Sequence, residues 1–132
     1  MREIATSHAK KAAWSAFATL VGIGTGIIVM LLFGWPDWRI CAFMISLFAV
    51  PVWLLVLLPI SVRLPPSSPL WRPATSTALG AGAGALMIIL ALGIWGGLQL
   101  ALIFAPVGAI VGGVTCLVGS TITRHVDRTR KA

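Results

Sequence analysis

The sequence predicts an all-α fold, an integral membrane bundle of four transmembrane helices in one domain spanning residues 1–132. Three stretches carry no charged residue: Ala12–Pro36, Ile40–Val62 and Pro73–Thr123. A helix needs roughly 20 apolar residues to cross the hydrocarbon core, so the first two stretches each allow one crossing and the third allows two. Hydrophobic residues make up 58% of the chain and charged residues 10%, which leaves too little polar surface for a soluble domain.

The spans are expected at about 12–33, 40–60, 75–94 and 98–119, with a proline-rich loop at 61–74 that joins two helical hairpins. The apolar run after Lys10 and Lys11 is longer than the hydrophobic region of a signal peptide. It also ends at Gly34-Trp35-Pro36, without a cleavage site of small residues. We therefore interpret it as an uncleaved first span.

The basic residues predict how the spans are oriented. Nine of the ten flank one side of the predicted spans, and Arg39 alone falls in a turn on the other side. Cytoplasmic flanks are enriched in Lys and Arg, so we expect both termini and the 61–74 loop in the cytoplasm, in a bacterial inner membrane. An even number of spans also requires the two termini to share a side. The nine are Arg2, Lys10, Lys11, Arg63, Arg72, Arg124, Arg128, Arg130 and Lys131.

The tryptophans favour the same topology. Five of the six fall at predicted span ends, where an amphipathic ring is stable at the level of the lipid headgroups. Trp53 alone falls inside a span. The expected outer residues are Trp35, Trp38 and Trp95, and the expected inner ones are Trp14 and Trp71.

Small residues at four-residue spacing predict helix contacts, because helices in lipid associate by close backbone approach. Either every such ridge packs within the bundle, or one of the two on the fourth span is spare and mediates assembly. The second span is bulky instead, and we expect it to face lipid or a partner. The ridges are Ala18, Gly22 and Gly26 on the first span; Gly80 and Gly84, with Ala78 and Gly82, on the third; and Ala101, Ala105, Ala109, Gly113 and Gly108, Gly112, Cys116, Ser120 on the fourth.

Pro51 and Pro106 lie near the middle of their spans. Each removes a backbone donor, so both helices are expected to kink at similar depth. Breaks at the midplane mark substrate sites in many transporters, but proline also occurs in membrane helices for packing alone. The packing interpretation is favoured because no charged residue accompanies either proline.

The sequence also contains a candidate internal repeat. Residues 22–35 align without gaps on residues 82–95, matching Gly22 with Gly82 and Gly24 with Gly84. The two hairpins are then either duplicated copies, related by an axis along the membrane normal, or similar through composition alone.

Groups that could perform chemistry are scarce, and the sequence predicts no catalytic, cofactor-binding or metal-binding residues. Asp37 and Asp127 are expected on opposite sides of the membrane, so no carboxylate pair can form. His8, His125 and Cys116 lack the spacing of metal ligands. The predicted spans contain no acidic or basic residue of the kind that lines ion pathways.

Other polar residues are expected to serve the structure. Cys41 and Cys116 should differ in depth by roughly 25 Å, too far for a disulfide, so both are expected to be free. Gln99 is the strongest candidate for a buried polar residue and is expected to bond across helices or to reach interfacial water. The weaker candidates are Thr25, Ser46, Thr77 and Thr115. Asp37 is expected to cap the second helix, and the 61–74 loop is expected to be extended and stiff.

We therefore expect a non-enzymatic multi-pass membrane protein that acts through helix packing, as an accessory subunit or a self-assembling interaction protein. The alternative is a small permease or holin-like pore built by oligomerisation. The expected partners are the lipid bilayer and a homo-oligomer or larger membrane complex. Despite a net charge of +7, nucleic acid is not expected, because the basic residues form no stripe along one face. Anionic headgroups should bind the basic C-terminal tail, Arg124, Arg128, Arg130 and Lys131.

Overall fold

The computed structural model describes the backbone of residues 2–65 and 67–131, and the side chains of 7–65, 67–94, 96–126, 128 and 129. It confirms the all-α fold, because four helical segments are long and apolar enough to cross a membrane: Ser7–Leu32, Trp38–Arg63, Pro73–Ile94 and Leu98–Val126. The elements are α1 (Arg2–Leu32), α2 (Trp38–Val52), a π-helical turn η1 (Trp53–Leu57), α3 (Leu58–Arg63), a 3-10 turn η2 (Pro69–Trp71), α4 (Pro73–Trp95) and α5 (Leu98–Lys131).

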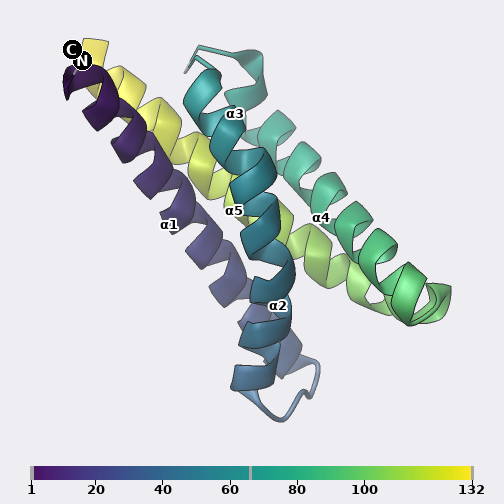
Figure 1. Cartoon of the computed structure of the whole chain (residues 1–132). Coiled ribbons are helices and arrows are strands. Elements are labelled where there is room, and N and C mark those ends of the chain that lie inside the picture. Colours follow the sequence, from purple (N-terminus) through teal and green to yellow (C-terminus); the bar gives the residue numbers. More distant parts are fainter. Residues whose placement is uncertain (1, 66, 132) are drawn as a thin grey trace.

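The two longest helices form the centre of the bundle. α1 and α5 run side by side in opposite directions, with α2 packed mainly on α1 and α4 packed on α5 (Figure 1). α1 has 31 residues and α5 has 34, so at a rise of 1.5 Å per residue they are about 46 Å and 51 Å long. A hydrocarbon core is about 30 Å thick, so both helices extend past it. Their extensions meet where the two ends of the chain lie together (Figure 1).

Gly34, Trp35 and Asp37 determine the turn between α1 and α2. Gly34 has a φ of +89°, and the Trp35 N–H donates to the Met30 carbonyl oxygen at 3.3 Å, which ends α1 in a Schellman motif. Asp37 then begins α2, since its Oδ1 accepts a hydrogen bond from the Arg39 backbone N–H at 2.8 Å. The predicted capping role of Asp37 is confirmed.

The helical hydrogen-bond pattern differs at the two prolines, and the predicted kink at each stays a prediction. Two residues after Pro51 the second span changes to the π-helical turn η1, in which the Leu58 N–H donates to the Trp53 carbonyl oxygen. α5 continues as an α-helix through Pro106 from Leu98 to Lys131. A proline leaves one carbonyl without its donor, and the second span adjusts its hydrogen bonds while α5 keeps its winding.

The 61–74 loop is shorter and more turned than expected. α3 extends to Arg63 and α4 begins at Pro73, so both helices take residues from it. Within the remainder, the Ser68 side chain accepts from the Leu70 N–H at 3.4 Å and starts the turn η2. Local side-chain bonds of this kind favour turns over extended backbone. Pro66 lies outside the described residues.

α4 and α5 approach through glycine, as the small-residue ridges predicted. A Cβ atom on Gly84 would overlap the carbonyl oxygen of Gly108, and one on Gly80 would overlap that of Gly112. Ser76, one turn earlier on the same face of α4, donates to the Cys116 carbonyl oxygen at 3.0 Å. The two backbones are therefore in direct contact along this face, which only glycine permits.

α1 uses its predicted ridge against α5. Ala18 is 2% exposed and faces Gly119, while a Cβ on Gly22 would overlap Thr115. Large side chains complete the centre, where α1, α2 and α5 meet in one cluster. Its buried members are Ile23, Met30, Cys41 and Ile45, with Phe104, Val107 and Val111 packed against them.

Most of the surface of the second span is exposed, and its contact with lipid or a partner stays a prediction. Leu55 is 71% exposed and Phe43 is 67% exposed, whereas Cys41 and Ile45 are buried against α1. α4 is even more exposed, since only 6% of its most apolar stretch is buried, against 11% of that of the second span. Both flanking helices therefore present large apolar faces.

The packing does not follow the proposed repeat. Gly22 packs against α5, whereas its match Gly82 faces open space. The next pair is reversed, since Gly24 faces open space and its match Gly84 packs against α5. Matched positions thus point in opposite directions relative to the bundle centre. Duplication remains a hypothesis about sequence and gives no symmetry of contacts.

Candidate functional site

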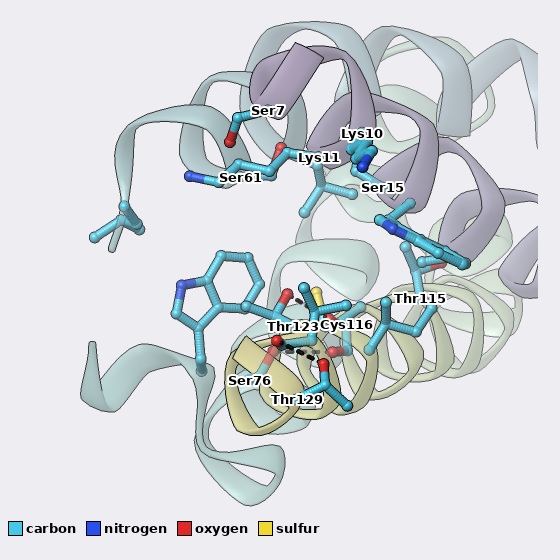
Figure 2. A pocket seen from close by; sticks show the side chains of 18 residues that line it. Ser7, Lys10, Lys11, Ser15, Ser61, Ser76, Thr115, Cys116, Thr123 and Thr129 are labelled. Atoms are coloured by element: carbon cyan, nitrogen blue, oxygen red, sulfur yellow. Dashed lines mark hydrogen bonds between the residues drawn. The ribbon is translucent and has the colours of Figure 1, made fainter. Parts of the chain in front are cut away.

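A cavity of about 610 Å³ lies at the end of the bundle that carries the termini. Four segments form it: the first half of α1, the stretch from Leu57 to Leu64, the stretch from Trp71 to Ser76, and the last part of α5 (Figure 2). This volume falls within the range of small-molecule sites. The cavity joins all four spans, so its shape depends on the whole bundle.

The lining combines cations, hydroxyl groups and apolar surface. Lys10 and Lys11 are the charged side chains among the described residues that line it. Figure 2 shows these lysines with Ser7 and Ser61 along one wall, and hydroxyl groups from α4 and α5 along the other. The hydroxyl-bearing residues are Ser7, Ser15, Ser61, Ser76, Thr115, Thr123 and Thr129, and apolar surface comes from Trp14, Ala18, Leu57, Trp71, Ile122 and Val126.

Most of these hydroxyl groups donate their one hydrogen bond to the protein itself. Thr123 donates to the Gly119 carbonyl oxygen at 2.8 Å, and Ser61 donates to that of Leu58 at 2.9 Å. Ser15, Ser76, Thr115 and Thr129 likewise donate to backbone carbonyls. A hydroxyl has one donor and two acceptor sites, so these oxygens offer acceptors, and the donors come mainly from the ammonium groups.

One hydrogen bond fixes the wall nearest α1. The Trp53 indole Nε1 donates to Ser15 Oγ at 3.1 Å and joins the π-helical turn to α1. Trp53 was the one tryptophan that the sequence placed inside a span. The π-helical turn and this bond occur together beside the cavity, next to Leu57 of the lining.

Two predictions about reactive groups can be compared with the structure. Cys41 and Cys116 are both free, as expected. Within the described part of the chain, no three His, Cys, Asp or Glu side chains are close enough to hold a metal ion. His8 and His125 are exposed, and the side chain of Asp127 lies outside the described residues.

Gln99 is not buried, because it is exposed in the first turn of α5. Its expected contact with interfacial water stays a prediction. The start of α5 lies beside the Gly97 turn, where neighbouring helices do not cover it. Instead, Ser120 is fully buried and donates to the Leu117 carbonyl oxygen at 2.9 Å. Thr115 is buried as well, and Thr77 Oγ1 is buried without a partner among the described residues.

Sequence reasoning missed the cavity, although its residues recur at helical spacing. Ser7, Lys11, Trp14 and Ala18 share one face of α1, and Thr115, Gly119, Ile122, Val126 and Thr129 share one face of α5. Both faces continue past the predicted spans, where polar and apolar residues alternate. This continued helical spacing could have indicated that α1 and α5 extend beyond the membrane and enclose a cavity.

Of the two alternatives for the α5 ridges, packing within the bundle agrees with the contacts of their glycines. Gly108 and Gly112 of one ridge, and Gly113 of the other, all face α4. α1 contacts α5 through Val111, Thr115 and Gly119 instead. The uncovered small residues belong to α4, where Ala78 and Gly82 are exposed on the side opposite Gly80 and Gly84.

The sequence matches no protein-family model, no curated protein and no solved structure. The four membrane-spanning helices characterise the chain as a multi-pass membrane protein.

Proposed function

We propose that this protein is a non-enzymatic membrane protein that self-associates through the outer face of α4. The observation that carries the proposal is the pair of small-residue ridges on this helix. Gly80 and Gly84 form the contact with α5, while the opposite ridge is exposed. That ridge consists of Ala74, Ala78 and Gly82 and continues into Leu86, Leu90 and Ile94.

The chemistry of lipid supports this use of the ridge. Lipid tails are as apolar as the helix surface, so association depends on close packing over small residues. Two copies in one membrane share an orientation, and a two-fold axis along the membrane normal would place the two α4 ridges face to face. α4 can do this because it lies at the edge of the bundle, and α5 is the one span on which it packs extensively (Figure 1).

The groups in the cavity support a role without catalysis. Six of its seven described hydroxyl groups donate to backbone carbonyls, and the Ser15 oxygen also accepts from Trp53. No described hydrogen bond joins any of the six to Lys10 or Lys11. A nucleophile needs a base within hydrogen-bond reach.

A pore built by oligomerisation is the second candidate, and the outer faces argue against it. The exposed residues of the second span and of α4 in the membrane are apolar, for example Phe43, Leu55 and Leu90. Thr25 lies mid-span but donates to the Val21 carbonyl oxygen of its own helix. A ring of such helices would offer water an apolar lining.

We further propose that both termini lie in the cytoplasm of a bacterial inner membrane. The support is the charge bias and the joint position of the two chain ends (Figure 1). A cysteine introduced at Ser67 should then react with an impermeant thiol reagent only from the cytoplasmic side, and one at Asp37 only from outside. Labelling of position 67 from outside would contradict this orientation.

Light scattering in mild detergent tests self-association. The wild-type protein should be a dimer, and Gly82→Leu should give a monomer with unchanged helix content. Gly24→Leu is the matched control, because it adds the same bulk at another glycine with open space and should leave the dimer intact. A wild-type monomer at all concentrations, or a Gly82→Leu dimer, contradicts the proposal. A monomer purified with a stoichiometric larger partner supports the accessory-subunit alternative.

A further inference from the structure

The cavity between the ends of α1, α3, α4 and α5 has the chemistry of a lipid site. It lies beside Lys10 and Lys11, which precede the first uncharged stretch, and beside Trp71, which precedes α4. Side chains of these types gather where a bilayer changes from hydrocarbon to headgroups. The cavity therefore lies at the depth of phospholipid headgroups if the chain spans the membrane as its four helices indicate.

The donors in the cavity select for an anion. Two ammonium groups come from adjacent residues, Lys10 and Lys11, and the described lining has no carboxylate to neutralise them. Each basic residue close to a membrane surface adds to the attraction for anionic lipid. A phosphodiester supplies one negative charge and two free oxygens that can accept from both lysines.

The acceptors in the cavity select for a donor on the same ligand. The hydroxyl groups of Ser61, Ser76 and Thr123 donate hydrogen bonds to backbone carbonyls, so their oxygens retain free acceptor sites. A ligand with only an anionic group would leave these oxygens unpaired. A headgroup that adds hydroxyl groups to the phosphodiester would satisfy both walls of the cavity (Figure 2).

The remaining lining suits acyl chains or the glycerol backbone. Ala18, Leu57 and Ile122 contribute apolar surface, and the indole of Trp71 lines the cavity with its Nε1 buried and without a partner among the described residues. An unpartnered indole N–H is a further donor for an oxygen of the ligand.

From these observations we infer that the cavity binds one anionic phospholipid whose headgroup carries hydroxyl groups, such as phosphatidylglycerol. The phosphate pairs with Lys10 and Lys11, and the headgroup hydroxyls donate to the Ser and Thr oxygens of the opposite wall. The cations of this site are Lys10 and Lys11 and not the basic residues of the C-terminal tail, although Val126 and Thr129 of that segment line it. The site does not depend on self-association through α4.

Native mass spectrometry with added lipid tests the inference. The wild-type protein should retain phosphatidylglycerol about tenfold more than phosphatidylcholine, and Lys10→Gln combined with Lys11→Gln should remove this preference. Arg63→Gln combined with Arg72→Gln is the matched control, because it removes two charges at the same end from residues outside the lining. If the control loses as much binding as the lysine variant, the attraction is general and the site is refuted.

Two further probes identify the ligand. Phosphatidylmethanol has the same charge without hydroxyl groups and should be retained several-fold less than phosphatidylglycerol, with the difference reduced in Thr123→Val. Equal retention of the two lipids would overturn the role of the hydroxyl acceptors. Inorganic phosphate at millimolar concentration should not displace the lipid, and displacement would instead identify a site for free phosphate. A thermal melt of each variant shows whether the fold is kept.

Discussion

The two flanking helices are attached to the central pair in different ways. α4 contacts α5 through backbone, with glycine opposite glycine at Gly84 and Gly108. α2 contacts α1 through side chains, chiefly Ile45 and Cys41, and through the Trp53 to Ser15 hydrogen bond that follows it. The first contact requires the absence of side chains and the second requires their presence, so the two should respond to substitution in opposite ways.

The largest effect is expected at the backbone contact. Gly84→Leu places a side chain where the Gly108 carbonyl oxygen lies, so α4 and α5 must separate. We expect a loss of at least about 3 kcal/mol in the free energy of unfolding, the upper range for overpacking. Titration with SDS in mixed micelles measures it.

Gly24→Leu is the control for this change, because it adds the same side chain in another span at a glycine with open space. It should alter stability by less than about 1 kcal/mol, the range of helix propensity. If both variants lose the same amount, the α4 to α5 contact is less close than described.

An intermediate effect is expected at the hydrogen bond on the other side. Trp53→Phe removes the donor to Ser15 Oγ and keeps an aromatic ring. Interhelical hydrogen bonds in membrane proteins are worth about 0.6 kcal/mol on average, so we expect a coupling of that size in a double-mutant cycle with Ser15→Ala. A coupling of zero would mean that η1 is held by packing alone.

The smallest effect is expected on the outer face of the second span. Leu55 is 71% exposed in η1, so Leu55→Ala removes few contacts and should cost less than about 0.5 kcal/mol. The same micelle titration measures it. A loss larger than that of Trp53→Phe would show that a partner or another copy covers this face.

Much of the fold follows from the sequence because a bilayer limits the choices. Uncharged stretches must become helices, and Gly34 and Asp37 determine the turn between the first two. The ridges on α1 and α4 were identified correctly because only small residues permit backbone contact. Which helix retained a spare ridge depended on the order of helices across the bundle, and ridge spacing alone does not determine that order.

The cavity could not be predicted because its walls come from four segments far apart in the sequence. Lys10 and Lys11 were recognised, but only as topology signals. Thr123 appeared as the end of an uncharged stretch, and its role as an acceptor depends on its bond to Gly119. The response to proline was missed for a similar reason, since neighbouring contacts determine whether a helix rewinds after Pro51.

The order of the helices also affects how the chain is assembled. α4 and α5 are consecutive, so their glycine contact can form as soon as both have been inserted. α1 makes its largest contact with α5, the last helix to be synthesised. At about 5–20 residues per second, α1 waits for several seconds with Gly22 facing lipid. We therefore expect docking of α1 onto the completed C-terminal hairpin to be the closing step of folding, with the cavity forming at that step.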